Sequence, residues 1–175
     1  HHKFRWILLL AASYYFYMCW NAKYALLILF STVCTYAGGL LIEFVKNRDW
    51  TDKKKTVVKK LGVAFVIVSN LAVLGYFKYT NFFIDSLKSL FELMSIELHI
   101  PAVDVLLPVG ISFYTFQALS YTIDVYRNDI YAEKNFFRYA LFVSFFPQLV
   151  AGPIERTKNL LKQLAVPKKF SYVKA

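Results

Sequence analysis

Cysteine, histidine and acidic residues are scarce in this sequence of 175 residues. Its two cysteines, Cys19 and Cys34, lie in different apolar runs and form neither a CxxC pair nor a Cys/His ligand pattern, which argues against a zinc site. Of the three histidines, two open the chain and His99 lies beside Ile100-Pro101, outside every long apolar run. The sequence therefore predicts no metal site and offers no histidine as a catalytic candidate.

Acidic residues are few: the sequence has 11 Asp and Glu against 21 Lys and Arg. The formal net charge is therefore +10. In a soluble protein this excess would suggest a nucleic-acid partner. Here the basic residues gather in one stretch, 46–60 (KNRDWTDKKKTVVKK), and no stacking aromatic residues interleave with them. Such a cluster beside apolar runs is typical of a membrane protein that contacts anionic lipid headgroups. We expect membrane lipids as partners and no nucleic acid.

Apolar residues make up 58% of the sequence and aromatic residues 19%, whereas soluble domains are ~45–50% apolar. A small soluble domain would have to hide runs such as 7–20 on every helix face, which it can rarely do. The predicted fold class is therefore all-α, a polytopic transmembrane helical protein with about four to five membrane segments plus interfacial amphipathic helices. We expect residues 1–175 to form a single, incomplete membrane domain.

The apolar runs place the expected membrane segments at 4–20, 24–45, 61–84, 108–125 and 136–152. Two further segments, 85–98 and 153–166, alternate apolar and polar residues at helical spacing. We interpret both as helices lying in the membrane interface, with a helix in a soluble loop as the alternative for 85–98. The positive-inside rule places the N-terminus and 46–60 on the cytoplasmic side.

Small and polar residues within these segments predict how the helices meet. Gly38 and Gly39 offer a surface on which another helix can approach closely. Asn70 lies near the middle of its segment and is expected to bond to a neighbouring helix, with a substrate role as the less favoured alternative.

The stretch 106–156 carries polar and helix-breaking residues within apolar sequence, where they are costly and usually functional. At helical spacing of 4, 3, 4 and 3 residues, one face of the segment 108–125 is formed by Gly110, Tyr114, Gln117, Tyr121 and Asp124. This face is either a hydrogen-bonded seam between helices or the wall of a cavity that holds a polar substrate. Beyond it, Asp124 and Arg127 are spaced to pair at the membrane edge.

The same stretch contains three prolines. Pro108 is suited to the first turn of its helix. Pro147 is expected to break the segment 136–152 and free a backbone carbonyl, which is tolerated at membrane depth only against protein or a water-filled cavity. Pro153 is suited to start a new helix after Gly152.

Two blocks, LLPVGISFYTFQALSYTIDVYR and FVSFFPQLVAGPIER, resemble the membrane-bound O-acyltransferase family, as does the opening run SYYFYMCWN. The likeness is nearest to the bacterial branch of alginate O-acetylation and teichoic-acid D-alanyl transfer proteins, and it covers nearly the whole chain. The residues that carry it are Pro108, Gly110, Gln117, Tyr121, Asp124, Tyr126, Arg127, Pro147, Gln148, Gly152, Pro153 and Glu155.

The resemblance implies a multi-pass enzyme of the bacterial cytoplasmic membrane that moves an activated acyl group to a hydroxyl. It implies an acyl donor such as acetyl-CoA or an acyl carrier protein thioester, an exported glycan as acceptor and an extracytoplasmic acyl-transfer partner protein. The family's catalytic histidine belongs to its C-terminal half, so this chain is expected to be an N-terminal portion without catalytic residues and inactive alone.

Within that family, the motif residues are expected to line the substrate passage. The substrate-channel candidates are Tyr114, Gln117, Tyr121, Asp124, Arg127 and Gln148, and the structural motif residues are Pro108, Gly110, Pro147, Gly152 and Pro153. The function expected of the whole protein is acyl transfer, with acetyl as the favoured group, to an exported polysaccharide. The alternatives are a D-alanyl transfer protein for teichoic acid, a transporter or channel without enzymatic activity, and a structural subunit that recruits a membrane partner.

Overall fold

A computed structural model describes residues 5–94, 106–152 and 157–165. In these ranges the chain forms helices and no strand, which confirms the predicted all-α class. The helices are α1 (Arg5–Trp20), α2 (Ala22–Lys46), α3 (Asp52–Leu93), α4 (Ile111–Arg127), α5 (Phe136–Ser144), α6 (Phe146–Ala151) and α7 (Thr157–Ala165).

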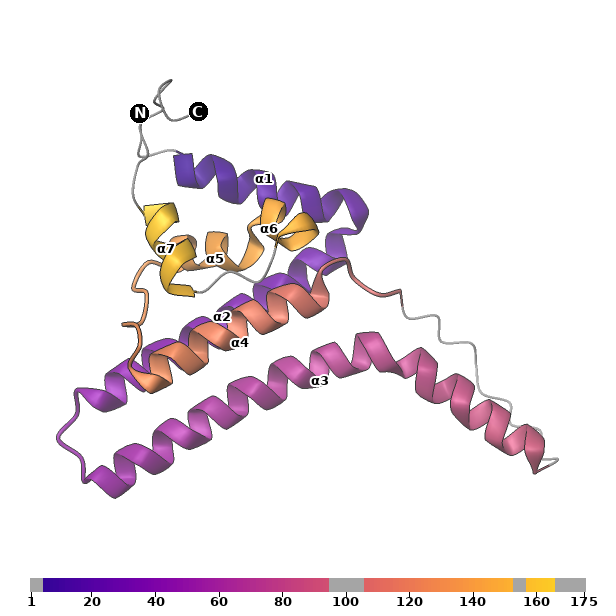
Figure 1. Cartoon of the computed structure of the whole chain (residues 1–175), viewed down its shortest axis with the longest axis horizontal. Coiled ribbons are helices and arrows are strands. Elements are labelled where there is room, and N and C mark those ends of the chain that lie inside the picture. The colour runs from indigo at the N-terminus through magenta and orange to yellow at the C-terminus, as the bar shows by residue number, and fades with distance from the viewer. Residues whose placement is uncertain (1–4, 95–105, 153–156, 166–175) are drawn as a thin grey trace.

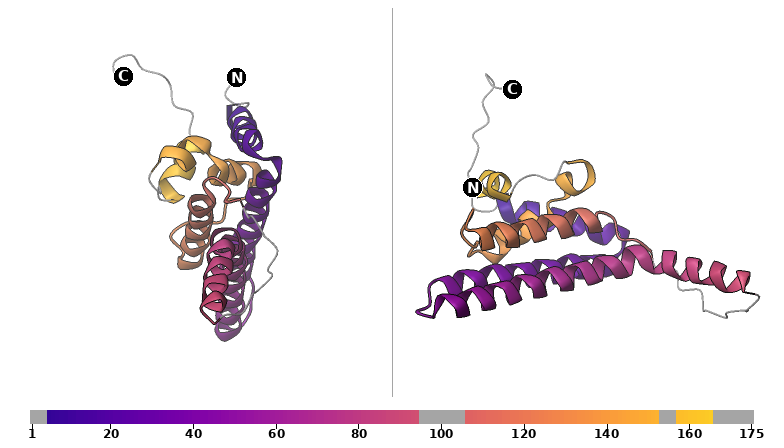
Figure 2. Two further views of the ribbon diagram at one scale, coloured as in Figure 1. Left: turned by 90° about the vertical axis from the view of Figure 1, so that its right-hand side faces the viewer. Right: turned by 60° about the horizontal axis from the view of Figure 1, so that its bottom comes forward.

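Helix α2 lies at the centre of the molecule and packs against α1, α3, α4 and α5. It runs side by side with α4 in the same direction, while α3 runs back along both (Figures 1 and 2). Hydrogen bonds join the matching ends of α2 and α4: Tyr24 donates to the Leu106 carbonyl before α4 begins, and Lys46 Nζ donates to the Val125 carbonyl near its end. Helices α5, α6 and α7 lie between α4 and α1 (Figure 1).

Two glycines of α2 allow its neighbours to approach, as the sequence predicted. A Cβ atom on Gly38 would lie 2.5 Å from Cγ2 of Val66 in α3. A Cβ atom on Gly39 would lie 2.8 Å from the Tyr121 hydroxyl oxygen in α4. Both distances are shorter than a real side chain tolerates, so α2 contacts α3 and α4 closely only because these positions lack side chains.

The predicted role of Asn70 as a link between helices is also confirmed. The Ser31 hydroxyl of α2 donates to Asn70 Oδ1 of α3, and the amide nitrogen of Asn70 donates to the Val66 carbonyl one turn earlier. Asn70 is buried, so both bonds satisfy polar atoms that have no access to solvent.

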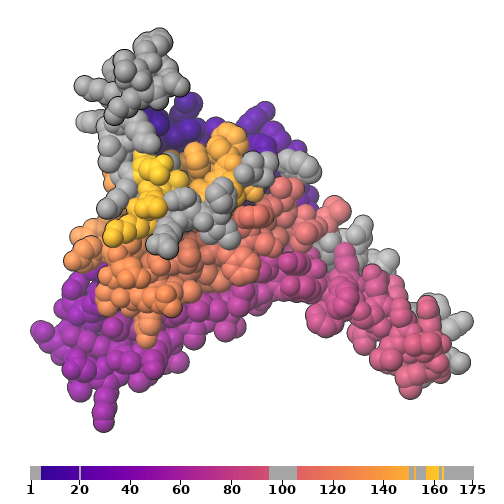
Figure 3. Space-filling model, in the orientation of Figure 1, coloured from indigo at the N-terminus to yellow at the C-terminus, as the bar shows by residue number. Residues whose placement is uncertain are grey.

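Helix α3 differs from its prediction, because it continues through the expected boundary between 84 and 85. It is one helix of 42 residues, or ~63 Å at 1.5 Å per residue, against ~30 Å for the hydrocarbon core of a bilayer. The side chains become more polar after Ile84, but polarity alone does not end a helix where neither proline nor glycine interrupts it. The later part of α3 projects from the body of the molecule (Figure 3). Residues 95–98 of the predicted interfacial helix lie outside the described residues.

The structure corrects the prediction for Pro108 and confirms that the segment 136–152 is broken beside Pro147. Pro108 lies in the loop before α4 and not in its first turn, and the N-cap is Gly110 with a φ of 73°. The break in 136–152 occurs at Phe145, two residues before Pro147, which lies in the first turn of α6. A proline ring clashes with the carbonyl four residues earlier, so the helix ends before it and restarts where no N–H is needed.

Among the described helices, α2 and α3 are long and apolar enough to cross a membrane. The helices at two other predicted spans are shorter, with 16 residues in α1 and 17 in α4, against the ~20 residues of a typical transmembrane helix. Large apolar side chains are exposed along α2 and α3, among them Leu26, Phe65 and Val68. Such a surface suits lipid better than water.

Candidate functional site

The polar face predicted on α4 is turned into the protein. Tyr114, Gln117 and Tyr121 are 1%, 2% and 0% exposed, while Asp124 is half-buried and Arg127 is exposed. Helix α4 packs against α2, α3, α5 and α7. A buried hydroxyl or amide requires a hydrogen-bond partner. Side chains that bond to neighbouring helices form a seam between helices, whereas side chains without a partner in the protein can line a cavity for a substrate.

Gln117 bonds to the backbone of the broken helix. Its side-chain nitrogen donates to the Phe142 carbonyl at 2.7 Å. In an unbroken helix this carbonyl would accept from the N–H of Phe146. The chain turns away at Phe145, and the Phe146 N–H donates instead to the Ser13 hydroxyl of α1 at 3.5 Å. Side chains of α1 and α4 therefore satisfy backbone groups that the break releases.

A cluster of three tyrosines lies further along the same interface. The rings of Tyr121 and Tyr139 are 4.4 Å apart between centroids, and those of Tyr36 and Tyr139 are 5.7 Å apart. The Tyr139 hydroxyl donates to Thr35 Oγ1 at 2.7 Å, and Thr35 in turn donates to the Ser31 carbonyl. Each ring packs while its hydroxyl keeps a partner, which is the usual arrangement for buried tyrosine.

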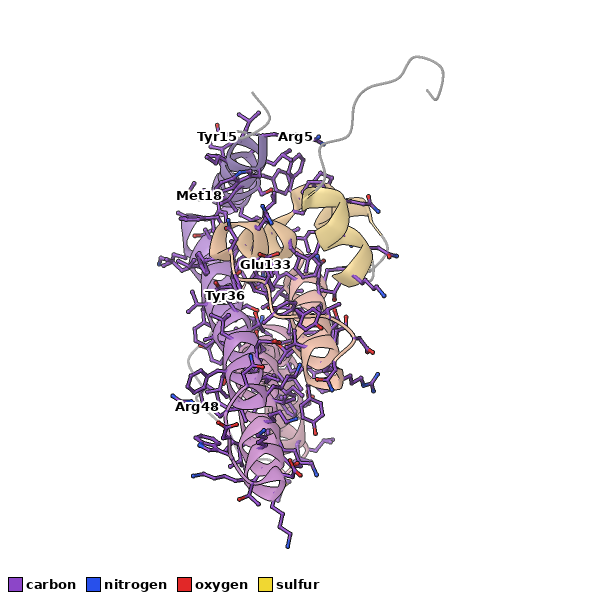
Figure 4. All side chains as sticks on the ribbon, turned by 90° about the vertical axis from the view of Figure 1, so that its left-hand side faces the viewer. Arg5, Tyr15, Met18, Tyr36, Arg48 and Glu133 are labelled. Atoms are coloured by element: carbon purple, nitrogen blue, oxygen red, sulfur yellow. The ribbon has the colours of Figure 1, made fainter. Side chains whose placement is uncertain are left out.

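The hydroxyls of this cluster also hold the connector 128–135 between α4 and α5. Tyr121 accepts a hydrogen bond from the Glu133 N–H, and Tyr36 donates to the Lys134 carbonyl. Figure 4 shows Tyr36 and Glu133 close together on this side of the molecule. Glu43 of α2 accepts from the Ala132 N–H at 3.5 Å and pairs with Lys46 at 3.7 Å. The connector is thus attached to α2 and α4 by side chains.

The pair expected between Asp124 and Arg127 is not formed. Within the described ranges the single ion pair joins Lys46 and Glu43. Asp124 contributes its backbone carbonyl to the end of α4, where it accepts from the Asp129 N–H, and Asn128 closes the helix with a φ of 67°. At this helix end the chain turns, and Arg127 remains exposed.

The remaining motif residues lie around α6. Gln148 is half-buried on this helix and Pro147 is exposed. Gly152 follows the helix, and its N–H donates to the Gln148 carbonyl at 2.9 Å. A Cβ atom on Gly152 would lie 2.9 Å from that carbonyl oxygen, so this tight turn requires glycine. Pro153 and Glu155 lie outside the described residues.

A groove of about 550 Å³ separates α1 from α5. It is lined by Trp6, Ile7, Leu10, Ala11, Tyr14, Phe136, Phe137 and Ala140. Its lining is aromatic and aliphatic, so it suits a hydrocarbon chain and offers no charged group for catalysis. Tyr15 and Met18 lie on the outer side of α1 (Figure 4).

Several residues of this interface were not singled out in the sequence. Tyr139, Ser13 and Glu133 each supply or receive a bond that holds the break or the connector. Tyr139 stands in an apolar run where it is not distinguished from its aromatic neighbours. The sequence gives one indication of this site, the spacing of four residues between Ser31 and Thr35, which predicts that the Thr35 hydroxyl bonds to the Ser31 carbonyl. It does not predict that Tyr139 donates to Thr35.

Comparison with known proteins gives relatives over nearly the whole chain. It is 43% identical over 161 residues to the probable alginate O-acetylase AlgI of Pseudomonas aeruginosa, covering 92% of this chain and 29% of that protein. It is 42% identical to the protein of the same name from Pseudomonas putida, covering 92% of this chain and 32% of that protein.

A more distant relative carries a different name. The chain is 30% identical over 182 residues to the peptidoglycan O-acetyltransferase of Helicobacter pylori, covering 90% of this chain and 32% of that protein. No family model and no solved structure matches the chain.

The chain thus spans about three-tenths of the length of these relatives, with shares of 29% to 32%. The identity extends over 92% of its residues, which is too long to arise from a single shared motif. The relatives and the exposed apolar helices together make it a membrane protein. This chain belongs to the membrane-bound O-acyltransferase family, in the group that contains the alginate O-acetylases.

Proposed function

We propose that the complete protein is an O-acetyltransferase that transfers acetyl groups to hydroxyls of an exported polysaccharide. The observation that carries the proposal is the 43% identity to an alginate O-acetylase over 92% of this chain, including both motif blocks. A peptidoglycan O-acetyltransferase among the relatives supports acetyl as the transferred group and a glycan as the acceptor.

The chemistry requires a base that takes the proton of the acceptor hydroxyl and donors that stabilise the oxyanion of the tetrahedral intermediate. The role proposed for α4, α5 and α6 is to form part of the wall of the reaction passage. The bonds from Gln117 and Ser13 keep the broken helix in a defined position.

The proposed acyl donor is acetyl-CoA or an acyl carrier protein thioester on the cytoplasmic side. The proposed location is the bacterial cytoplasmic membrane, with several passes and with the N-terminus and 46–60 in the cytoplasm. Arg48, Lys53 and Lys54 are exposed in that turn, where they suit the anionic headgroups of the cytoplasmic leaflet. An extracytoplasmic acyl-transfer protein completes the proposed pathway to the glycan.

The test is deletion of the gene in its own bacterium, followed by NMR of the exported polysaccharide. We expect O-acetyl esters to disappear while the amount of exported polymer stays the same, and the complete gene in trans to restore them. Loss of the polymer itself would instead favour a transporter. Loss of D-alanyl esters with acetyl esters unchanged would favour D-alanyl transfer.

A further inference from the structure

Tyr114 differs from the other buried polar side chains of α4. Its hydroxyl is buried and has no hydrogen-bond partner among the described residues, although the side chain is only 1% exposed. Gln117 and Tyr121, on the same face, direct their polar atoms at the Phe142 carbonyl and the Glu133 N–H. Tyr114 is thus the candidate channel residue whose hydroxyl no described residue engages.

The start of α4, one turn before Tyr114, lies close to α1 and α6. The Tyr114 N–H bonds to Gly110, the left-handed residue that opens α4. The Tyr17 hydroxyl of α1 lies 3.4 Å from the position that a Cβ atom on Gly110 would occupy, and the carbonyl oxygen of Leu149 in α6 lies 3.7 Å from it. Tyr17 and Tyr114 belong to the same buried cluster of side chains.

The energetics make such an arrangement unusual. A buried hydroxyl without a partner loses its hydrogen bonds to water and gains none in return, and phenylalanine would fill the same space without that cost. Tyr139 and Tyr121 show the usual solution, in which each hydroxyl finds a partner within the protein. Tyr14 also lacks a bond within 3.5 Å, but Thr32 of α2 lies close enough to interact with it.

We infer that Tyr114 is a ligand-binding residue whose hydroxyl donates a hydrogen bond to an oxygen of the acyl group as it passes between α1, α4 and α6. This inference rests on the proposed acetyl transfer. The carbonyl oxygen of a thioester or ester accepts hydrogen bonds and has no proton to donate, so it complements a phenol donor. A sugar hydroxyl and a water molecule also contain an oxygen that accepts a hydrogen bond. The experiment distinguishes these two ligands from the acyl group.

The experiment compares Tyr114→Phe with the wild type in the complete protein, in membrane vesicles given radiolabelled acetyl-CoA and the exported polysaccharide. We expect kcat/KM for acetyl-CoA to fall at least tenfold. We also expect the stability of the variant to equal or exceed that of the wild type, because the lost hydroxyl had no protein partner. Tyr15→Phe, at a hydroxyl that is exposed on the outside of α1, should leave both quantities unchanged.

Each other outcome is decisive. Unchanged kinetics in Tyr114→Phe, or a change only in the dependence on polysaccharide, would overturn the assignment to the acyl group. A variant that fails to fold would also overturn it, because it would show that the hydroxyl has a structural partner. If wild-type vesicles transfer no label to polysaccharide, the proposed function itself fails. If they transfer label and Tyr114→Phe does so equally well, only the inference fails.

Discussion

The side-chain amide of Gln117 replaces the backbone donor that the Phe142 carbonyl loses where α5 ends, with a distance of 2.7 Å between nitrogen and oxygen. The two residues come from helices that are separated by the connector 128–135. The bond explains how a helix can break inside the protein without leaving this carbonyl unsatisfied. It also gives Gln117 a structural task that its place in a family motif did not reveal.

Gln117→Leu should therefore destabilise the protein by ~1–3 kcal/mol, because the buried Phe142 carbonyl would lose its donor while the volume of the side chain stays similar. The measurement is SDS-induced unfolding of the complete protein from mixed micelles. Gln163→Leu is the matched control, since Gln163 is exposed on α7. Equal stability of the two variants would show that the bond carries no net energy.

The bond between Tyr139 and Thr35 should be measurable by a double-mutant cycle with Tyr139→Phe and Thr35→Val. The expected coupling is ~0.6 kcal/mol and at most ~1.7 kcal/mol, the range found for hydrogen bonds between membrane helices. The same unfolding assay supplies the four free energies. Additive effects of the two substitutions would mean that the hydroxyls do not interact.

Gly39→Ala should destabilise the protein by ~1–3 kcal/mol, because the new methyl group meets the buried Tyr121 ring. The contacts, at 2.8 Å to Cε1 and to the hydroxyl oxygen, involve a side chain that is 0% exposed and therefore has little room to move away. Gly75→Ala in α3 is the control, since no atom lies within 4 Å of its Cβ position. That substitution should be neutral or stabilise the helix by up to ~1 kcal/mol. Similar free energies of unfolding for the two variants would contradict the close packing of α2 against α4.

The proposed topology predicts the labelling of introduced cysteines. In a background with Cys19→Ser and Cys34→Ala, Asp49→Cys should react with an impermeant maleimide only after the cells are opened. Lys23→Cys, at the opposite end of α2, should react in intact cells. Mass spectrometry of the purified protein gives the labelled fraction. The opposite pattern of access would invert the proposed orientation.

Local patterns predicted the interactions that depend on the type of residue. Gly38 and Gly39 indicated close packing because no other residue lets helices approach so far. Asn70 indicated a link between helices because an amide within an apolar segment needs a partner. In both cases the chemistry of one residue restricts its surroundings, whichever helix supplies the neighbour.

Positions of helix ends were predicted less well. The break that Pro147 predicts is present, but the residue at which the chain turns, Phe145, does not follow from the sequence. The change in polarity after Ile84 was interpreted as an end, yet α3 passes through it. Backbone hydrogen bonds decide where a helix stops, and they respond to capping and packing as well as to polarity.

The sequence by itself determined that the chain is helical and apolar, that its polar residues share one face of 108–125, and which family it resembles. These properties follow from composition and from spacing along a single helix. The tertiary structure decided what each residue of that face does. Gln117 meets a carbonyl 25 residues away, and Tyr139 meets a hydroxyl 104 residues away. A buried polar group acts according to its partner, and only the packing of distant helices determines whether that partner is the backbone, another side chain or, for Tyr114, a ligand.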